Sequence, residues 1–222
     1  MIKNTEGLIK NLSQDLYPVR PLPSPLIRTL LWIVILCPYV VLVVLIIGLV
    51  LRRPTSTLDT RFVVEQIFAL STGIAAAMAA FASVIPGRNR SFLFWPLIPM
   101  VGWLGTLGEG CLRAGTLETS FHHNLWCFPY IIILGTAPAI VLGVMLRRGA
   151  PLTPHITAGL GAIAAAGLGN FCVRLVHQED VTVMLLAWHV GGVFLVAALS
   201  SAAGSYMLNW RSVVGASAKT RG

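Results

Sequence analysis

The chain has 222 residues, of which 56% are hydrophobic and only 11% are charged, whereas soluble domains carry about 25% charged residues. This composition excludes a disordered or collagen-like chain and argues against a soluble enzyme, and the length fits a single membrane domain. The net charge of +8 comes from basic residues at the ends of apolar runs, where they orient membrane helices rather than bind nucleic acid.

A polar leader, residues 1–25, precedes the first apolar run. Within it, residues 5–16 predict a short helix, because four apolar residues recur at helical spacing. These residues are Leu8, Ile9, Leu12 and Leu16. A helix of this length is marginal by itself in water. We therefore expect its apolar face to bind the membrane interface or a groove on a partner protein.

Prolines dominate the rest of the leader, at positions 18, 21, 23 and 25. This spacing prevents a helix and favours an extended polyproline conformation, which rises about 3.1 Å per residue. The prolines would hold the short helix away from the membrane as a stiff spacer. An ordinary juxtamembrane segment would also fit this composition, and the sequence leaves both interpretations open.

Six apolar segments are long enough to cross a bilayer, which takes about 20 residues. They cover residues 29–51, 66–86, 92–108, 124–146, 154–173 and 181–210. The predicted fold class is therefore all-α: a polytopic membrane bundle of six transmembrane helices with a short cytoplasmic N-terminal amphipathic helix. Residues 26–210 would form the transmembrane domain and residues 211–222 a cytoplasmic tail.

Small residues recur at helical spacing in the last two segments, for example Ala165 and Gly169 in the fifth, and Ala197, Ser201 and Ser205 in the sixth. Small residues four positions apart allow helix backbones to approach closely in lipid. We therefore expect the fifth and sixth helices to pack tightly together.

The placement of Lys and Arg sets the orientation of the bundle. With a cytoplasmic N-terminus, eleven of the sixteen basic residues lie on the inner side and five on the outer side. Because inner loops of membrane proteins carry the excess of Lys and Arg, both termini are predicted to be cytoplasmic.

Soft and borderline metal ligands gather near the predicted outer loops. The candidate signal-sensing residues are Cys111, His122, His123, Cys127, Cys172 and His177. Such ligands suit zinc or copper, and His122, His123, Cys127 and His177 would form the metal site. No fixed ligand spacing is matched, so a polar loop with incidental histidines also explains the pattern. A disulfide between Cys111 and Cys127 is a further alternative on an oxidising face.

Ionisable residues are scarce inside the predicted spans. Glu65 is expected in the first turn of the second span, near the outer interface, and only His189 lies well inside a span. A proton-coupled transporter would need more such groups. A transporter or channel therefore stays the alternative function, and a thiol redox membrane enzyme is disfavoured because the chain has no CxxC. No catalytic motif is present, and we predict that the chain is not an enzyme and has no cofactor beyond a regulatory divalent metal.

Four stretches of the chain resemble the NrsF family of bacterial six-span membrane anti-sigma factors, negative regulators of sigma F. They are LIKNLSQDLYPVRPLPSPLIR in the leader, Trp126-Cys127, LRRGAPLTP at 146–154, and LVHQED at 175–180 followed by Leu208-Asn209-Trp210. The resemblance spans nearly the whole chain in the right order.

The resemblance implies that the chain keeps an extracytoplasmic-function sigma factor at the bacterial inner membrane, away from RNA polymerase, with no direct contact to nucleic acid. The leader would be the sigma-binding element, through Leu8, Ile9, Leu12, Leu16, Val19 and Arg20. Release would follow a metal or redox stress signal at the outer face, which the family links to two cysteines. Cys127 matches the first of these, but the second position is Gln178 here, so a mixed cysteine and histidine site is the alternative to a two-cysteine switch.

Overall fold

The computed structural model describes residues 2–14, 21–51, 60–114, 127–176 and 183–208. All regular structure in these ranges is helical, which confirms the all-α class. In chain order the helices are α1 (Ile2–Gln14), α2 (Pro25–Leu51), α3 (Thr60–Ser83), the short 3₁₀ helix η1 (Arg90–Phe94), α4 (Leu97–Ala114), α5 (Cys127–Arg147), α6 (Pro154–Val176) and α7 (Val183–Met207).

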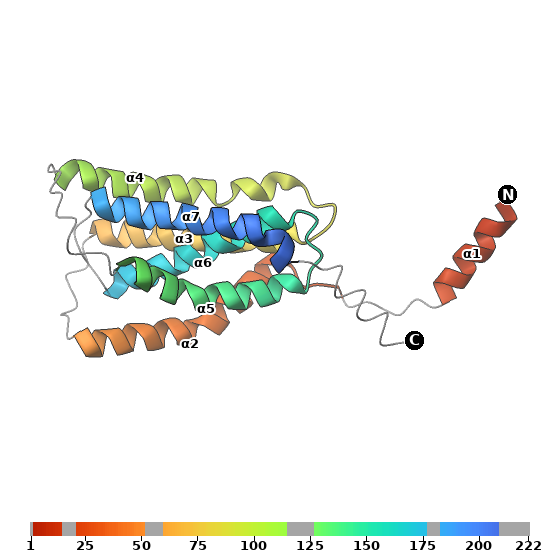
Figure 1. Cartoon of the computed structure of the whole chain (residues 1–222), viewed down its shortest axis with the longest axis horizontal. Helices are drawn as coiled ribbons and strands as arrows, with labels where there is room; N and C mark the ends of the chain where they lie inside the picture. The colour runs from red at the N-terminus through yellow and green to blue at the C-terminus, as the bar shows by residue number, and fades with distance from the viewer. Residues whose placement is uncertain (1, 15–20, 52–59, 115–126, 177–182, 209–222) are drawn as a thin grey trace.

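Helices α2–α7 form one bundle in which successive helices run in opposite directions, and α1 lies apart from it (Figure 1). Five of the six predicted apolar segments each correspond to one helix of the bundle, and the third corresponds to η1 and α4. We call the end at which α2 begins and α5 ends the leader end, because it faces α1 in Figure 1. The opposite end, at which α5 begins, is called the far end.

Helix α6 lies at the centre of the bundle, in contact with α3, α5 and α7. Of its apolar span 72% is buried, against 22% for that of α2. The small residues of α6 explain this position, because they allow three neighbours to approach one backbone. Helix α2 instead lies at the margin and exposes large apolar side chains such as Val34 and Leu49, as a lipid-facing helix does.

Glycines mark the closest approaches between helices. A Cβ atom added at Gly167 of α6 would lie 3.0 Å from the Cα of Gly73 on α3. One added at Gly204 of α7 would lie 2.5 Å from the carbonyl oxygen of Pro154, at the start of α6. The predicted tight packing of the fifth and sixth helices is therefore confirmed.

Four stretches are long and apolar enough to cross a membrane, at residues 25–43, 60–83, 90–110 and 154–175. The described parts of α5 and α7 add shorter apolar stretches, Ile133–Arg147 and Val190–Tyr206. The structure is thus compatible with a membrane protein, and the count of six spans stays a prediction.

Two helix boundaries differ from the prediction. The third segment divides into η1 and α4, because Pro96 between them has no amide hydrogen to continue a helix. Helix α3 begins at Thr60 rather than Gln66, so Glu65 lies in its second turn and is buried. Glu65 packs against a partner in the bundle, and its predicted place near the outer interface stays a prediction.

Candidate functional site: the leader helix and the two ends of the bundle

Helix α1 carries the predicted binding face of the leader. It begins at Ile2 and ends at Gln14, a few residues earlier than predicted. Leu8 and Ile9 are 58% and 60% exposed, so both apolar side chains are available to a partner. The backbone of Leu12 lies in the same helix, whereas its side chain and Leu16, Val19 and Arg20 lie outside the described residues. A 13-residue helix with exposed apolar side chains gains stability when a second surface covers them.

The leader passes directly into the first helix of the bundle. Residues 21–24 are exposed and have no regular structure, as the prolines at positions 21 and 23 predict. Pro25 occupies the first position of α2, where its missing amide hydrogen is not needed. The side-chain oxygen of Ser24 accepts a hydrogen bond from the Ile27 amide at 3.4 Å. Any movement of α2 therefore moves the point from which the leader emerges.

Arg28 ties the start of α2 to two other helices at the leader end. Its guanidinium donates a hydrogen bond to the carbonyl oxygen of Met145 on α5 and lies 4.4 Å from the ring centroid of Phe81 on α3. Four residues further along α2, the Trp32 indole donates to the carbonyl oxygen of Pro138 at 3.1 Å. These contacts couple α2 mechanically to α5.

Most of the predicted sensing residues at the far end lie beyond what the structure describes. His122, His123 and His177 fall outside the described residues, and Cys111 and Cys127 lie in helices with side chains that are not described. Among the described side chains, no three His, Cys, Asp or Glu residues come together. The metal site therefore stays a prediction.

Cys172 is the sensing candidate that the structure does describe. Its thiol is free, and the residue is 1% exposed. It packs in an apolar cluster with Leu134 of α5 and Val173. A buried thiol among apolar side chains is typical of a structural cysteine rather than a reactive one, so this position does not favour a direct sensing role.

A buried ion pair joins α3 and α6 toward the far end. Arg174 Nε donates to Glu65 Oε1 at 3.0 Å and a terminal guanidinium nitrogen donates to Oε2 at 3.1 Å. The two side chains are only 6% and 3% exposed, and the Arg174 guanidinium lies 5.7 Å from the ring centroid of Phe62. The bundle therefore buries two charged side chains near the ends of α3 and α6, and these add to His189, which the sequence places well inside a span.

The sequence signal for this pair was weak. Both residues stand at the edges of apolar runs, where charges usually mark the membrane interface. A carboxylate and a guanidinium can lie inside a bundle when each supplies the other's hydrogen bonds. Opposite charges at the same end of two neighbouring helices would indicate such an ion pair. The sequence does not show that α3 and α6 are neighbours, so the pair could not be predicted from it.

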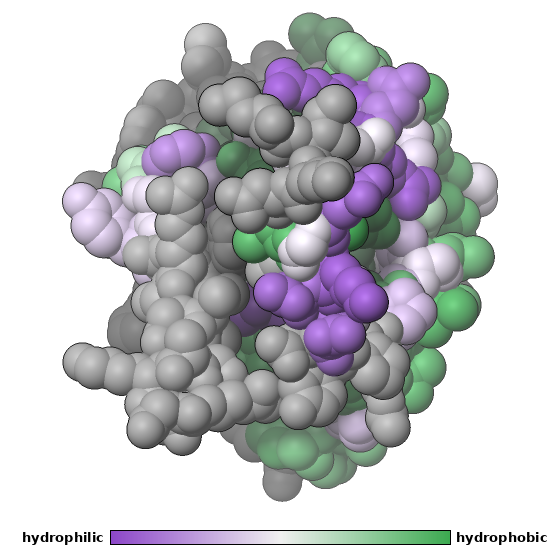
Figure 2. All heavy atoms as spheres, turned by 90° about the vertical axis from the view of Figure 1, so that its right-hand side faces the viewer, coloured by the Kyte–Doolittle hydropathy of each residue, from purple (hydrophilic) through white to green (hydrophobic). Residues whose placement is uncertain are grey.

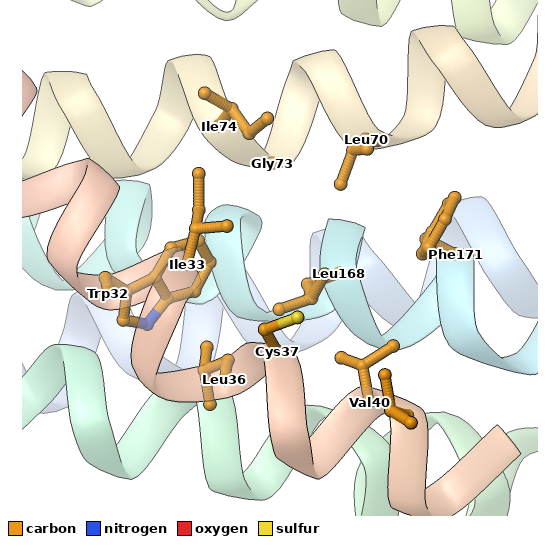
Figure 3. Close-up of a pocket in the computed structure, with 11 residues that line it drawn as sticks. Trp32, Ile33, Leu36, Cys37, Val40, Leu70, Gly73, Ile74, Leu168 and Phe171 are labelled. Carbon is orange, nitrogen blue, oxygen red and sulfur yellow. The ribbon is translucent and has the colours of Figure 1, made fainter. Parts of the chain in front are cut away.

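An apolar cavity of about 190 Å³ lies between α2, α3 and α6 (Figure 3). Trp32 and Leu36 of α2, Ile74 of α3 and Leu168 of α6 line it, and the Cys37 sulfur borders it. A second cavity of about 140 Å³ lies between α5, α6 and α7 and is also mostly apolar. Neither provides the polar lining that a route for ions would need.

Comparison with known proteins gives one assignment. The family model described as "Negative regulator of sigma F" (NrsF) matches residues 12–210. No curated protein and no solved structure matches the chain. The family match includes all six bundle helices and begins inside α1. The chain therefore belongs to the NrsF family of negative regulators of sigma F.

Proposed function

We propose that the chain is an integral membrane anti-sigma factor that holds an extracytoplasmic-function sigma factor at the bacterial inner membrane. The family supports negative regulation of a sigma factor, and the long apolar helices support the membrane location. The observation that carries the proposal is the exposed apolar pair Leu8 and Ile9 on a helix that lies apart from the bundle.

The leader helix acts by inserting its apolar face into a groove on the sigma factor. Leu8, Ile9, Leu12 and Leu16 are the proposed anchors, and burying a leucine or isoleucine contributes about 1.5–3 kcal/mol. Val19 and Arg20 extend the contact along the spacer. A sigma factor held in this way stays at the membrane, so the function is binding rather than catalysis.

Replacing Leu8 with Asp tests the leader directly. A charge in an apolar groove loses the burial energy and adds a desolvation penalty, so we expect capture of the sigma factor to fall at least about tenfold, equal to 1.4 kcal/mol. The measurement is co-purification of each sigma factor of the same genome with the full chain in detergent.

Gln14→Asp is the matched control. Gln14 lies on the face of α1 opposite the apolar residues, and the substitution introduces the same negative charge as Leu8→Asp. It should capture the sigma factor as well as the wild type does. Undiminished capture by Leu8→Asp would contradict the groove-binding role of the leader.

Release is proposed to begin at the far end, through Cys127 with His122, His123 and His177, and Cys111 and Cys172 as further candidates. Cys127 is the first residue of α5, and Met145 near the end of the same helix accepts the hydrogen bond from Arg28. A helix of 21 residues is about 30 Å long. A metal or oxidant that binds one packing of α5 better than another would therefore bias the position of α2 and of the leader.

Cys127→Ser tests this route to release. If Cys127 senses the signal, induction of the sigma-dependent genes by a divalent metal or peroxide should disappear, while repression without the signal is kept. Cys37→Ser is the control, because Cys37 borders an apolar cavity near the middle of α2 and should leave induction unchanged. Normal induction in Cys127→Ser would eliminate this residue as the sensor without affecting the sequestration proposal.

A further inference from the structure

The apolar cavity between α2, α3 and α6 offers a ligand almost no hydrogen-bonding groups. Its lining side chains are aliphatic or aromatic, apart from the one thiol at its border. The indole nitrogen of Trp32, which Figure 3 shows, already donates to the carbonyl oxygen of Pro138. Cavities of about 150 Å³ with apolar walls stay dry and bind small hydrocarbons, and this one measures about 190 Å³. Its chemistry therefore selects a hydrocarbon.

The cavity borders the outer side of the bundle through α2. Val41 lines it and is 51% exposed, and only 22% of the apolar span of α2 is buried. Seen from the side of α1, hydrophobic residues also occupy much of the right-hand and lower margins of the bundle (Figure 2). Helices that are apolar on their outer sides face lipid chains in a membrane. A lipid chain can therefore reach the cavity without crossing a polar layer.

The depth of the cavity matches the tails of lipids rather than their headgroups. Its lining residues on α2, from Trp32 to Val41, lie near the middle of that helix, and Leu70 and Ile74 lie near the middle of α3. The hydrocarbon core is about 30 Å thick, so the middle of a spanning helix lies about 15 Å from either headgroup layer. A phospholipid tail reaches this depth while its headgroup stays at the interface.

Packing explains why α2 leaves this space beside α3 and α6. Pro38 lies inside α2 at the level of the cavity and has no amide hydrogen for the preceding turn, which allows the helix to bend. Trp32 and Tyr39, on either side of Pro38, donate hydrogen bonds to the carbonyl oxygens of Pro138 and Leu134. These contacts hold α2 against α5, and the cavity lies on its other side.

We propose that the cavity binds one acyl chain of a bilayer phospholipid, inserted between α2 and the pair formed by α3 and α6. The chain completes the apolar packing of α2, and this role is separate from the release signal at the far end. The inference rests on the membrane location in the proposed function, and it adds a ligand that the family assignment does not include.

The test measures nuclear Overhauser effects between lipid and protein, which arise only between protons at short range. The full chain carries protonated Leu and Val methyl groups in a deuterated background and is placed in phosphatidylcholine nanodiscs. Leu168 is the reporter, because it lines the cavity from α6 and is only 8% exposed. Val34 of α2, 66% exposed, is the lipid-facing reference, and Leu142 of α5, 1% exposed, is the buried reference.

We expect cross-peaks from acyl-chain methylenes to Leu168 and Val34 and none to Leu142. Val40→Phe places a ring in the cavity and should remove the Leu168 cross-peak, and the milder Val40→Leu should weaken it. The matched control, Val34→Phe, adds the same ring on the exposed side of α2 and should leave the Leu168 cross-peak unchanged. With chain-deuterated phospholipid, the wild-type cross-peak at Leu168 should disappear.

Three results would overturn the inference. They are a wild type with a cross-peak at Val34 but none at Leu168, a Leu168 cross-peak that survives Val40→Phe, and one that persists with chain-deuterated phospholipid. The last result would assign the cavity to another hydrocarbon molecule. The two wild-type measurements decide the inference even if Val40→Phe does not fold. A missing cross-peak at Val34 would instead contradict the membrane location and, with it, the proposed function.

Discussion

Glu65 and Arg174 show that charged residues at the edges of apolar segments can be buried between helices as an ion pair. The sequence placed Glu65 in the first turn of a span, near the outer interface, and the structure shows that both side chains are buried and make two hydrogen bonds to each other. In apolar surroundings either charge alone would be strongly destabilising, and the pair is tolerated because each side chain satisfies the other. The pair fixes the register of α3 against α6 toward the far end.

Glu65→Leu should destabilise the bundle by about 3–5 kcal/mol, because it leaves the buried guanidinium of Arg174 without this carboxylate. The measurement is thermal unfolding of the full chain in detergent. The double variant Glu65→Leu/Arg174→Met removes both charges and should recover most of the loss. If the single variant were as stable as the wild type, the pair would not be buried as the structure has it.

The sequence predicted residue positions well where one local rule decides them. The prolines at 21, 23 and 25 have no amide hydrogen, and residues 21–24 have no regular structure and are exposed. The buried partners of Arg28 could not be predicted in the same way, because Phe81 and Met145 meet it only through tertiary packing. For the sensing cysteines and histidines, the prediction still rests on the sequence and the family.

At the scale of whole elements, hydropathy and length were sufficient to predict all six helices of the bundle, since a run of about 20 apolar residues has few other stable structures. Which helices touch was predictable only for α6 and α7, where small residues at helical spacing indicated close packing. The central position of α6 was not predicted, because it depends on contacts with α3 and α5 as well.

Gly204→Ala should separate the start of α6 from the end of α7. The added methyl group would lie 2.5 Å from the Pro154 carbonyl oxygen and 2.9 Å from the His155 Cα, and backbone atoms cannot move aside as a flexible side chain can. We expect a loss of about 1–3 kcal/mol, measured as the shift in thermal unfolding in detergent.

Gly191→Ala is the control within the same helix. No atom lies within 4 Å of a Cβ at this position, and alanine is favoured over glycine in a helix interior by about 1 kcal/mol. The control should therefore be neutral or slightly stabilising. Equal destabilisation by the two substitutions would show that close contact between α6 and α7 is not what makes Gly204 sensitive.

At the scale of the whole molecule, the bundle has two chemically different ends joined by long helices. The leader end carries the start of α2, to which the leader connects α1, and the exposed side chains of Arg88 and Arg148. The far end carries the start of α5, where the proposed sensor lies. Because α5 begins at Cys127 and ends beside Arg28, a change at one end can reach the other through one helix. This arrangement suits the proposed function, in which a signal at the far end changes the presentation of the leader at the other end.

The central claim is that the leader helix and the sigma factor share the cytoplasmic side of the membrane. The direct measurement places one cysteine in α1, as Ser13→Cys, in a chain whose four native cysteines are replaced by Ser, and labels it with a membrane-impermeant maleimide. A second chain with Ser56→Cys, between α2 and α3, reports the opposite side. In intact spheroplasts, we predict labelling of the cysteine at position 56 alone, with position 13 labelled only after lysis. Labelling at position 13 in intact spheroplasts would contradict the account, because a leader on that side could never meet a sigma factor.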